Sequence, residues 1–460
     1  MNQFIAMSKE LLADMETPVS AFLKLCRTEP DAYLFESSET VEAIGRYSII
    51  AWGPLGRIKL YHDRVEVSDN SGLRSCSPGE FFDVSRSLLA GMSCAGLPDL
   101  PFVGSLVGYV GYDTVRLIEK LPETFIGEKP IADLSLLSQF VIFDHHRRLM
   151  TLVAISKSTT DCTAMIREVE DRLRQNAYNG YTRRTFSYDY PSRHIFMESV
   201  EIARKHILDG DIFQVVLSGQ FKGRGALDPF DVYRWMRVKN PSPYMFYCSN
   251  GDRKLVGASP ETLVKIDGGS LYIRPIAGTR GRSNDPAVDR YLEHELMGSE
   301  KEKAEHIMLV DLARNDAGRV CEYGSVKVDP FMTVERFSHV MHIVSQVQGT
   351  PNHGLDSWNV FKAAFPAGTV SGAPKVRAME IIAQLEQAPR GPYGGAVGFW
   401  GAGQKMDTCI AIRMIEFDGD EFTLQAGAGI VADSIPEMEY EEILKKAAHG
   451  VAALKAAAGE

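Results

Sequence analysis

Alternating apolar and polar positions recur through most of the chain, and helix-like stretches interrupt them. Short runs rich in β-branched and aromatic residues are separated by polar, turn-like segments, which favours antiparallel hairpins over a doubly wound parallel sheet. The pattern predicts a chain of mixed α and β structure. The β-like runs in the first 160 residues are YLFES, RYSIIAW, RIKLYH, RVEVSD, QFVIFDH and LMTLVAI.

Helix start signals accompany several of the other stretches. A Thr-Pro step opens 17–26, where Thr suits the N-cap and Pro the first turn. Residues 77–80 (SPGE) form a capping-box pattern ahead of FFDVSRSLLAG. Apolar spacing then predicts helices over 192–209 and from Pro229. The stretch 293–312 is expected to form one long helix.

One polar, aromatic segment shows no clear periodicity. It covers 177–193, AYNGYTRRTFSYDYPSR. A chain of 460 residues suggests two or three domains on length alone. We therefore expect an N-terminal domain over 1–176, a connecting segment over 177–193 and a C-terminal domain over 194–460.

Composition narrows the class of protein. The hydrophobic content of 45% is enough for a large core, and the net charge of -10 argues against a nucleic-acid-binding surface. The chain has neither an apolar run of membrane-spanning length nor a signal-peptide layout, so we expect a cytoplasmic enzyme without a membrane partner. The seven cysteines are scattered, without zinc-like spacing or a nucleophile turn, which predicts reduced thiols and no glutaminase centre on this chain. No P-loop is present.

Two Glu-x-x-Glu pairs stand in helix-like stretches of the second half. They are Glu302 with Glu305, and Glu439 with Glu442. Each pair places its carboxylates on one face of a helix, about one turn apart. Four facing carboxylates would need a cation, and oxygen ligands suit Mg²⁺. A pair on its own is more often a solvated helix face.

Long motifs across nearly the whole chain resemble those of the chorismate-utilising enzymes, and most closely the anthranilate synthase component I group. Their number and their common order make the resemblance specific. The motifs are GDIFQVVLS, NPSPYMFY, GASPETLVK, RPIAGTR, AEHIMLVDLARND, FSHVMHIVS, FPAGTVSGAPKVRAMEII, YGGAVGF, MDTCIAIR and QAGAGIVADS.

The resemblance implies a fold and a reaction. The fold is α/β (α+β), a two-domain sandwich of stacked, largely antiparallel sheets with flanking helices, with chorismate and Mg²⁺ in the cleft. The reaction converts chorismate and ammonia to anthranilate and pyruvate, the first step of tryptophan biosynthesis. A separate glutamine amidotransferase subunit would deliver the ammonia, in a heterotetramer, and tryptophan would inhibit.

The resemblance also assigns roles to single residues. Glu261 would be the general acid, its pKa raised by the neighbouring acidic cluster and a dry cleft, and His342 would assist the loss of pyruvate. Glu305 and Glu442 would bind Mg²⁺ directly, with Glu302 and Glu439 beside them. Arg413 would form a fork to one substrate carboxylate. The expected substrate-binding set is Thr279, Thr369, Tyr393, Arg413, Gly427, Gly429 and Lys446.

Each role has a plainer alternative. His342 stands in an apolar strand-like run, where a lone histidine is often a hydrogen-bonded core residue. Glu261 follows Ser-Pro and suits a helix N-terminus, and Arg413 suits a structural ion pair. Tyr393 and Met245 would ordinarily be assigned to the core. The joint occurrence of these residues in motif order favours the catalytic interpretation.

Two positions discriminate among members of the family. Water-adding relatives, the isochorismate and salicylate synthases, resemble this chain but carry a lysine where it has Gln214. One common type of aminodeoxychorismate synthase has a lysine where this chain has Ala277. Both lysines are missing, which favours anthranilate synthase. Aminodeoxychorismate synthase component I and a non-catalytic tryptophan-binding regulatory subunit remain as alternatives.

A second site is implied by YLFESSE and NPSPYMFY. In the resemblance these segments form a pocket for tryptophan, the end product of the pathway, and inhibition requires two conformations that tryptophan and chorismate bind unequally. Phe35 departs from the leucine that is common in the family. Gly219 and Gly281 also depart from it and affect the expected loop shape. The expected tryptophan-binding residues are Glu36, Ser37, Asn240, Pro243, Tyr244 and Met245.

Overall fold

Antiparallel strands dominate the structure, a computed structural model that describes residues 4–460 except 38–44, 70, 93, 97, 123–126, 177–183, 338, 339 and 404. Among the pairings of the described residues, only β1 with β6 is parallel, which confirms the expected sheets of hairpins. The strands are β1 (Phe4–Leu12), β2 (Asp31–Glu36), β3 (Tyr47–Leu60), β4 (Val65–Asp69), β5 (Gly72–Cys76), β6 (Cys94–Ala95), β7 (Ser105–Val110), β8 (Ala132–Asp144), β9 (Leu149–Ser156), β10 (Phe186–Asp189), β11 (Gln214–Gly225), β12 (Tyr244–Asn250), β13 (Arg253–Ser259), β14 (Thr262–Asp267), β15 (Ser270–Ile273), β16 (Ile276–Gly281), β17 (Lys327–Val328), β18 (Thr333–Arg336), β19 (Val340–Val344), β20 (Val347–Gly349), β21 (Gly372–Ala373), β22 (Ala396–Gly401), β23 (Met406–Ile410), β24 (Met414–Asp418) and β25 (Glu421–Ile430).

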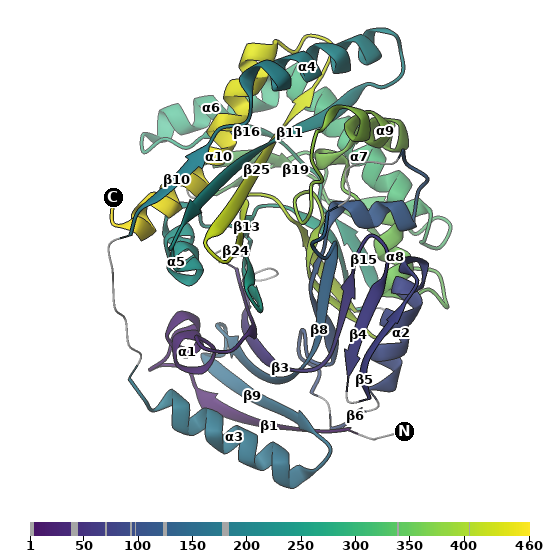
Figure 1. Ribbon diagram of the computed structural model, residues 1–460. Coiled ribbons are helices and arrows are strands. Elements are labelled where there is room, and N and C mark those ends of the chain that lie inside the picture. Colours follow the sequence, from purple (N-terminus) through teal and green to yellow (C-terminus); the bar gives the residue numbers. More distant parts are fainter. Residues whose placement is uncertain are drawn as a thin grey trace.

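Helices cover the outside of this sheet structure. Figure 1 shows α3 outside β1 and β9, and α10 running between α4 and α5 along β25. The predicted N-cap at Thr17, followed by Pro18, and the predicted capping box at Ser77 are both present. The helices are α1 (Pro18–Leu25), α2 (Phe81–Gly91), α3 (Thr159–Leu173), α4 (Arg193–Leu208), α5 (Pro229–Lys239), α6 (Pro286–Gly298), α7 (Glu300–Gly318), α8 (Ser357–Ala364), α9 (Lys375–Leu385) and α10 (Pro436–Ala458), with short 3₁₀ helices at Pro78–Glu80, Tyr112–Leu117 and Gly368–Val370.

The large sheet closes on itself and joins both halves of the chain. Strand β2 pairs with β12, and β7 pairs with β22, so the ladder passes from residues before the expected connecting segment to residues after it. Part of that segment, 177–183, lies outside the described residues. The division at 177–193 therefore stays a prediction.

Two predicted elements were wrong in extent. The runs RYSIIAW and RIKLYH belong to one strand, β3, whose register on β8 shifts between Pro54 and Gly56. A bulge of this kind bends a strand without ending it, so the turn-like residues in the middle were misleading.

The expected long helix over 293–312 is two helices, α6 and α7, that meet at Ser299. The side chain of Ser299 accepts a hydrogen bond from the backbone N–H of Glu302, and Gly298 precedes it. Glycine disfavours the helix interior and serine favours an N-cap, so the chain ends one helix and starts another. Glu302 and Glu305 consequently lie in the first two turns of α7.

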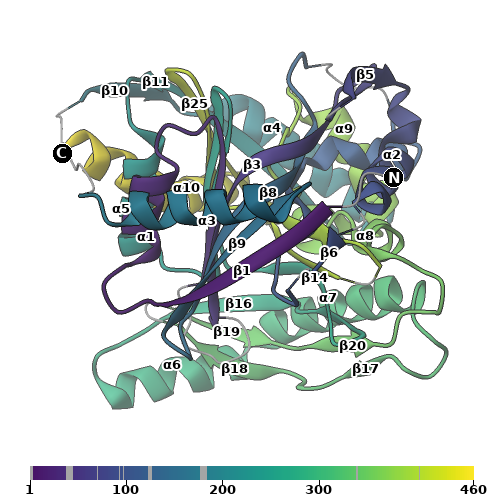
Figure 2. The same ribbon diagram turned by 90° about the horizontal axis from the view of Figure 1, so that it is seen from below.

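A small second sheet lies beside the large one. Strands β16, β19 and β18 form it in that order, and Figure 2 shows them with α6 and α7 along one side of the molecule. Leu296 of α6 packs against Met341 and Ile343 of β19. This packing sets the position of β19, which carries His342.

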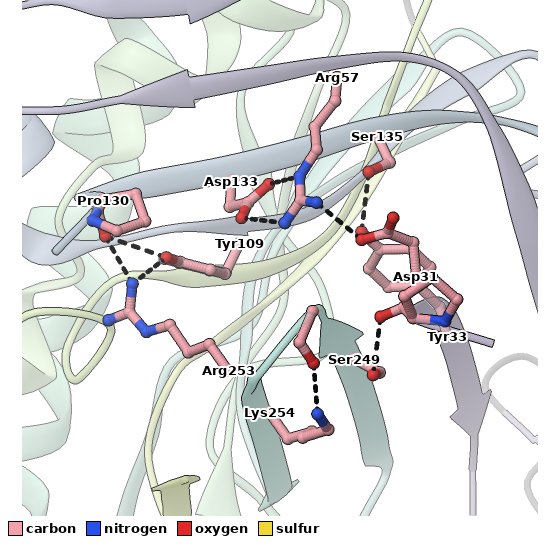
Figure 3. A network of polar contacts seen from close by, with 12 residues as sticks. Asp31, Tyr33, Arg57, Tyr109, Pro130, Asp133, Ser135, Ser249, Arg253 and Lys254 are labelled. Atoms are coloured by element: carbon pink, nitrogen blue, oxygen red, sulfur yellow. Dashed lines mark hydrogen bonds and ion pairs between the residues drawn. The ribbon is translucent and has the colours of Figure 1, made fainter. Parts of the chain in front are cut away.

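Inside the large sheet, apolar packing surrounds a network of charged groups. Trp358 and Trp400 are fully buried and stack at 5.4 Å between ring centroids. Figure 3 shows the polar network, in which Arg57 of β3 joins Asp133 of β8 and Asp31 of β2.

Among the helices that the structure describes, none combines the length and apolar character needed to cross a membrane.

Candidate functional site

Glu261 lies at the turn between β13 and β14. Its backbone carbonyl accepts a hydrogen bond from the N–H of Ile410 at 3.0 Å, which ties the turn to the end of β23. The side chain is buried, and the hydroxyl group of Thr369 donates to its Oε1 at 3.0 Å. A carboxyl group in this position is held at a defined point and has little contact with water.

The proton of Glu261 is retained near neutral pH. Burial raises the pKa of the carboxyl group from 4.5 to about 8, and the Thr369 hydrogen bond and the charges of Arg413 and Lys446 oppose this rise. Desolvation disfavours the charged form of an acid. The sequence-based prediction named both a dry cleft and the acidic cluster as causes of this raised pKa. The acidic cluster was wrong, because neither Glu-x-x-Glu pair contributes to the raised pKa.

Arg413 stands between β23 and β24 with φ of 49°, in the left-handed region. Such a conformation costs a non-glycine residue roughly 1–3 kcal/mol and is often found at functional sites. Burial lowers the pKa of the guanidinium group, and the charge of Glu261 opposes that effect. The strained backbone thus holds a partly desolvated cation close enough to influence the acid, as an anionic ligand would require.

His342 of β19 is buried at 6% exposure. Its Nδ1 lies 2.8 Å from the carbonyl oxygen of Gly278 and 3.1 Å from Oγ1 of Thr279. Because a carbonyl only accepts, Nδ1 carries the proton and Nε2 keeps a lone pair. Burial lowers the pKa of the imidazole, which favours this neutral form. The ring can therefore accept a proton at Nε2.

Two glycines of β25 open space beside these groups. A Cβ on Gly427 would lie 2.6 Å from the hydroxyl oxygen of Tyr393, and one on Gly429 would lie 2.7 Å from Nε2 of Gln214. Both side chains therefore reach the strand only because it lacks side chains at these positions. Lys446 of α10 donates to the carbonyl of Gly427 at 3.0 Å. Tyr393 and Lys446 thus both approach Gly427, and their role in binding substrate stays a prediction.

The first carboxylate pair lies on α7 with Glu305 partly buried. Burial and the neighbouring Glu302 raise the pKa of Glu305. Nε2 of Gln214 lies 3.5 Å from its Oε1. Arg280 of β16 forms an ion pair with Glu302 at 3.1 Å. One carboxylate of this pair thus has a cationic partner, while the other is left partly desolvated beside it.

The second pair lies on α10 and shows the same asymmetry. Burial, followed by the charge of Glu442, raises the pKa of Glu439, while Lys301 and Lys446 lower it. Lys446 forms an ion pair with Glu442 at 2.7 Å. The same two lysines also act on Glu305, so α7 and α10 face a shared pair of cations.

The structure does not gather the four carboxylates into one cluster. Within the described part of the chain, no three side chains of His, Cys, Asp or Glu lie close enough together to hold a metal ion. Arg280 and Lys446 bind one carboxylate of each pair, which explains the spacing. The donors nevertheless fit Mg²⁺, because they are carboxylates only and two of them have pKa values raised by burial and a like charge.

A cavity of about 570 Å³ opens on the far side of Tyr393. Residues of both chain halves line it, among them Ile131, Gln220, Arg253 and Arg390. Tyr393 is buried and lies between this space and Gly427. Tyr393 therefore contacts both this cavity and Gly427.

The expected tryptophan residues lie around the pairing of β2 with β12. Met245 is directly opposite Glu36 in the ladder. The carboxylate of Glu36 accepts from the Tyr233 hydroxyl at 2.5 Å and forms an ion pair with Arg237 at 2.8 Å. Tyr233 and Arg237 belong to α5, and Asn240 ends that helix. Asn240 and Pro243 are buried, whereas Ser37 is partly exposed.

The hydroxyl group of Tyr244 also takes part in a contact near Glu261. Its hydroxyl group donates to Oδ1 of Asp407 at 2.9 Å and lies 3.0 Å from Oγ1 of Thr262, the neighbour of Glu261. Thr262 and Asp407 were not predicted as site residues, although they stand in the motifs GASPETLVK and MDTCIAIR. Spacing alone could not have found them, because the contact joins three strands.

Comparisons with known proteins give a consistent result. The family model described as chorismate binding enzyme matches residues 30–451. The anthranilate synthase component 1 of Acetivibrio thermocellus is 39% identical over 96% of this chain and 94% of its own length, and that of Streptomyces coelicolor is 42% identical over 96% and 87%. The crystal structure of anthranilate synthase component I from Streptococcus pneumoniae superposes with a TM-score of 0.79 at 34% identity, covering 96% of this chain and 99% of that one.

Proposed function

Because the chain belongs to the chorismate binding enzyme family and within it to the anthranilate synthase component 1 proteins, we propose that it converts chorismate and ammonia to anthranilate and pyruvate. The observation that carries the proposal is Glu261, a buried carboxyl group that keeps its proton near neutral pH beside a strained arginine. A general acid works best when its pKa lies near the working pH.

The first step needs an acid. Chorismate carries a ring hydroxyl group that leaves as water when the C–O bond breaks, and Glu261 supplies the proton. Ammonia forms the new C–N bond two carbons away and then loses a proton. Arg413 suits a substrate carboxylate, because a guanidinium group donates two parallel hydrogen bonds. The hydroxyl of Tyr393 and the ammonium group of Lys446 supply donors at the other end.

The second step needs a base. The ring C–O bond breaks, and the enolpyruvyl group leaves with its oxygen and takes up a proton at its methylene carbon to become pyruvate. The ring becomes aromatic by losing a proton from carbon. His342 suits this role, since its Nδ1–H is bound to Gly278 and its Nε2 is left to accept. Burial lowers the pKa of His342 and so keeps its imidazole neutral.

Magnesium completes the proposed site. Glu305 and Glu442 would hold the ion, with Glu302 and Glu439 beside it or acting through water. The ion would neutralise a carboxylate of the substrate within an acidic wall. Because the ion would bind a carboxylate of the substrate, the metal and the substrate are expected to bind interdependently. Arg280 and Lys446 form ion pairs with Glu302 and Glu442.

Two partners belong to the proposal. A glutamine amidotransferase subunit supplies ammonia, in agreement with the term component 1 in the names of the relatives, and the assembly is a heterotetramer. Tryptophan inhibits by binding near Glu36 and Met245, which pair across β2 and β12. Met245→Ala should raise the tryptophan concentration for half-inhibition about tenfold, the effect of losing roughly 1.4 kcal/mol of buried contact. Unchanged inhibition would place the inhibitor elsewhere.

One assay tests the function. The purified chain is mixed with chorismate, Mg²⁺ and ammonium, and anthranilate fluorescence is followed with and without a chelator and with and without tryptophan. Anthranilate that forms only when Mg²⁺ is free supports the proposal. Accumulation of aminodeoxychorismate would instead identify an aminodeoxychorismate synthase, and tryptophan binding without turnover would identify a regulatory subunit.

A further inference from the structure

A second group of side chains lies behind the turn that carries Glu261. Thr262 is the first residue of β14 and directly follows Glu261, which precedes the strand. Thr262 is 7% exposed, and its Oγ1 lies 3.0 Å from the hydroxyl oxygen of Tyr244. That hydroxyl donates to Oδ1 of Asp407 at 2.9 Å. Because Tyr244 uses its proton on Asp407, Thr262 must donate to Tyr244.

The side chains of Thr262, Tyr244 and Asp407 meet where the pairing of β14 with β23 is irregular. Strand β14 pairs with β23 from Thr262 to Ile266, and the register shifts between Thr262 and Val264. A bulge leaves a residue without its ladder partner and re-aims the side chains around it, which is why bulges occur next to active sites. The hydrogen bond from Ile410 to the carbonyl of Glu261 holds one side of the turn. The hydroxyl of Thr262 holds the other side.

We infer that Thr262, held by Tyr244 and Asp407, is a positioning residue that sets the direction of the Glu261 carboxyl group. The inference rests on the proposed function, in which Glu261 is the acid. With both sides of the turn held, the carboxyl group stays against Thr369 and away from water. Releasing one side would let it turn and become hydrated.

Different charges act on Glu261 and on Asp407. The groups that act on Glu261 are the Thr369 hydroxyl and the cations of Arg413 and Lys446. Asp407 has a pKa raised by burial and is influenced by Lys265 at 3.6 Å, by the Tyr244 hydroxyl and by Asp267. Neither Lys265 nor Asp407 is among the groups that shift Glu261, so Thr262 acts on the acid through geometry.

The test compares Thr262→Val with Thr262→Ser. Valine keeps the branched shape and loses the hydroxyl, whereas serine keeps the hydroxyl. We expect Thr262→Val to lower kcat about tenfold and to move the alkaline limb of the pH profile down by about one pH unit, because a hydrated Glu261 ionises more easily. The chorismate KM should change less than about twofold, since no substrate contact is lost. Thr262→Ser should restore the wild-type profile.

A second measurement reports on Glu261 without turnover. The infrared carboxyl band that is present in the wild type and missing in Glu261→Gln follows the protonation of Glu261 as pH is varied. In Thr262→Val this band should disappear at lower pH than in the wild type. If the wild type makes no anthranilate, the proposed function fails, and the band still decides whether Thr262 positions the carboxyl group.

Coupling between the two hydroxyl groups provides the last check. Tyr244→Phe removes the partner of Thr262, so the double variant with Thr262→Val should shift the band no further than either single variant. Independent, additive shifts would overturn the inference. An unmoved band and pH limb in Thr262→Val would also overturn it, as would equal losses in the valine and serine variants.

Discussion

Two regions of the molecule remove charged side chains from water, and they do so with opposite results. In the network of Figure 3, Arg57 binds both carboxylate oxygens of Asp133 at 2.6 and 2.7 Å and also reaches Asp31 at 2.7 Å. Burial opposes ionisation, yet the hydrogen bonds and charge of Asp133 hold the pKa of Arg57 above its usual range. Arg57, Asp133 and Asp31 thus each have an oppositely charged partner in direct contact.

Glu261 is buried with far less compensation. One hydroxyl donates to it, and the charges of Arg413 and Lys446 act on it without outweighing burial. Its pKa consequently moves to about 8, where a proton can be given up and regained near neutral pH. The comparison teaches that complete pairing makes a buried charge structural, whereas incomplete pairing makes a buried acid reactive.

The sharpest test of this contrast is Glu261→Gln. The amide keeps the shape and the Thr369 contact but has no proton to give. Loss of a general acid should lower kcat about a thousandfold, or roughly 4 kcal/mol in activation free energy. Chorismate binding should persist, as measured by equilibrium titration. A variant with a normal rate would remove Glu261 from the acid role.

A substitution in the paired network around Arg57 should change the stability of the protein and leave the pH dependence of its activity unchanged. Asp133→Leu leaves Arg57 buried with Asp31 as its remaining partner, and breaking a buried pair costs about 3 kcal/mol or more. We expect a large fall in the denaturant midpoint with the pH profile of activity unchanged. Asp63→Leu is the control, because Asp63 pairs with Arg64 at the surface and such pairs contribute about 0–1 kcal/mol. Similar losses in both variants would contradict the contrast.

His342→Asn tests the base of the same site. The asparagine amide can still donate to Gly278, but no lone pair replaces Nε2. We expect turnover to anthranilate to fall about a hundredfold, with aminated intermediate released before pyruvate is lost. Chromatography of the products measures this. His306→Asn is the control, since His306 is also buried but binds Ser345. Unchanged anthranilate yield in His342→Asn would exclude the role.

The pH dependence has the smallest expected effect. Glu261 must be protonated to act, so kcat should fall about tenfold per pH unit above a pKa of about 8. The folded pKa lies above the usual value of 4.5, so the unfolded chain loses this proton first as pH rises. The stability that the proton contributes is full below pH 4.5 and is lost as pH rises to about 8. Thermal melts of the wild type should therefore fall relative to Glu261→Gln across that window.

An alkaline limb that begins near pH 4.5, or parallel melting curves for the two proteins, would show that Glu261 ionises normally. In that case the difference between the two buried regions would disappear. The pH profile is measured on the wild type alone, so a fault in the Glu261→Gln variant cannot explain both results.

Much of the fold followed from local patterns. Antiparallel pairing, the capped starts of α1 and α2, and the helix over α4 were predicted correctly because period and capping are properties of neighbouring residues. The break at Ser299 was missed, since the apolar spacing continues across it. The bulge in β3 was missed because Pro54 and Gly56 also suit a turn.

The candidate site shows the same division. Motifs selected Glu261, Arg413 and His342, and helical spacing selected the two carboxylate pairs. The structure brings Tyr393 and Lys446 to Gly427. The pairing of Glu302 with Arg280 and the role of Thr262 were not foreseeable. Each contact joins two different elements, 22 and 18 residues apart along the chain, and no local pattern specifies how such elements meet.

The sequence by itself determined which chemical groups the protein has, where its helices and strands run, and the family to which it belongs. The tertiary structure decided how those groups behave. Whether Glu261 holds a proton depends on how much water and how many partners surround it, and both are set by residues from β14, β23, 3₁₀ and helical segments far apart along the chain. Desolvation and pairing are properties of the assembled surroundings, which no stretch of neighbouring residues specifies.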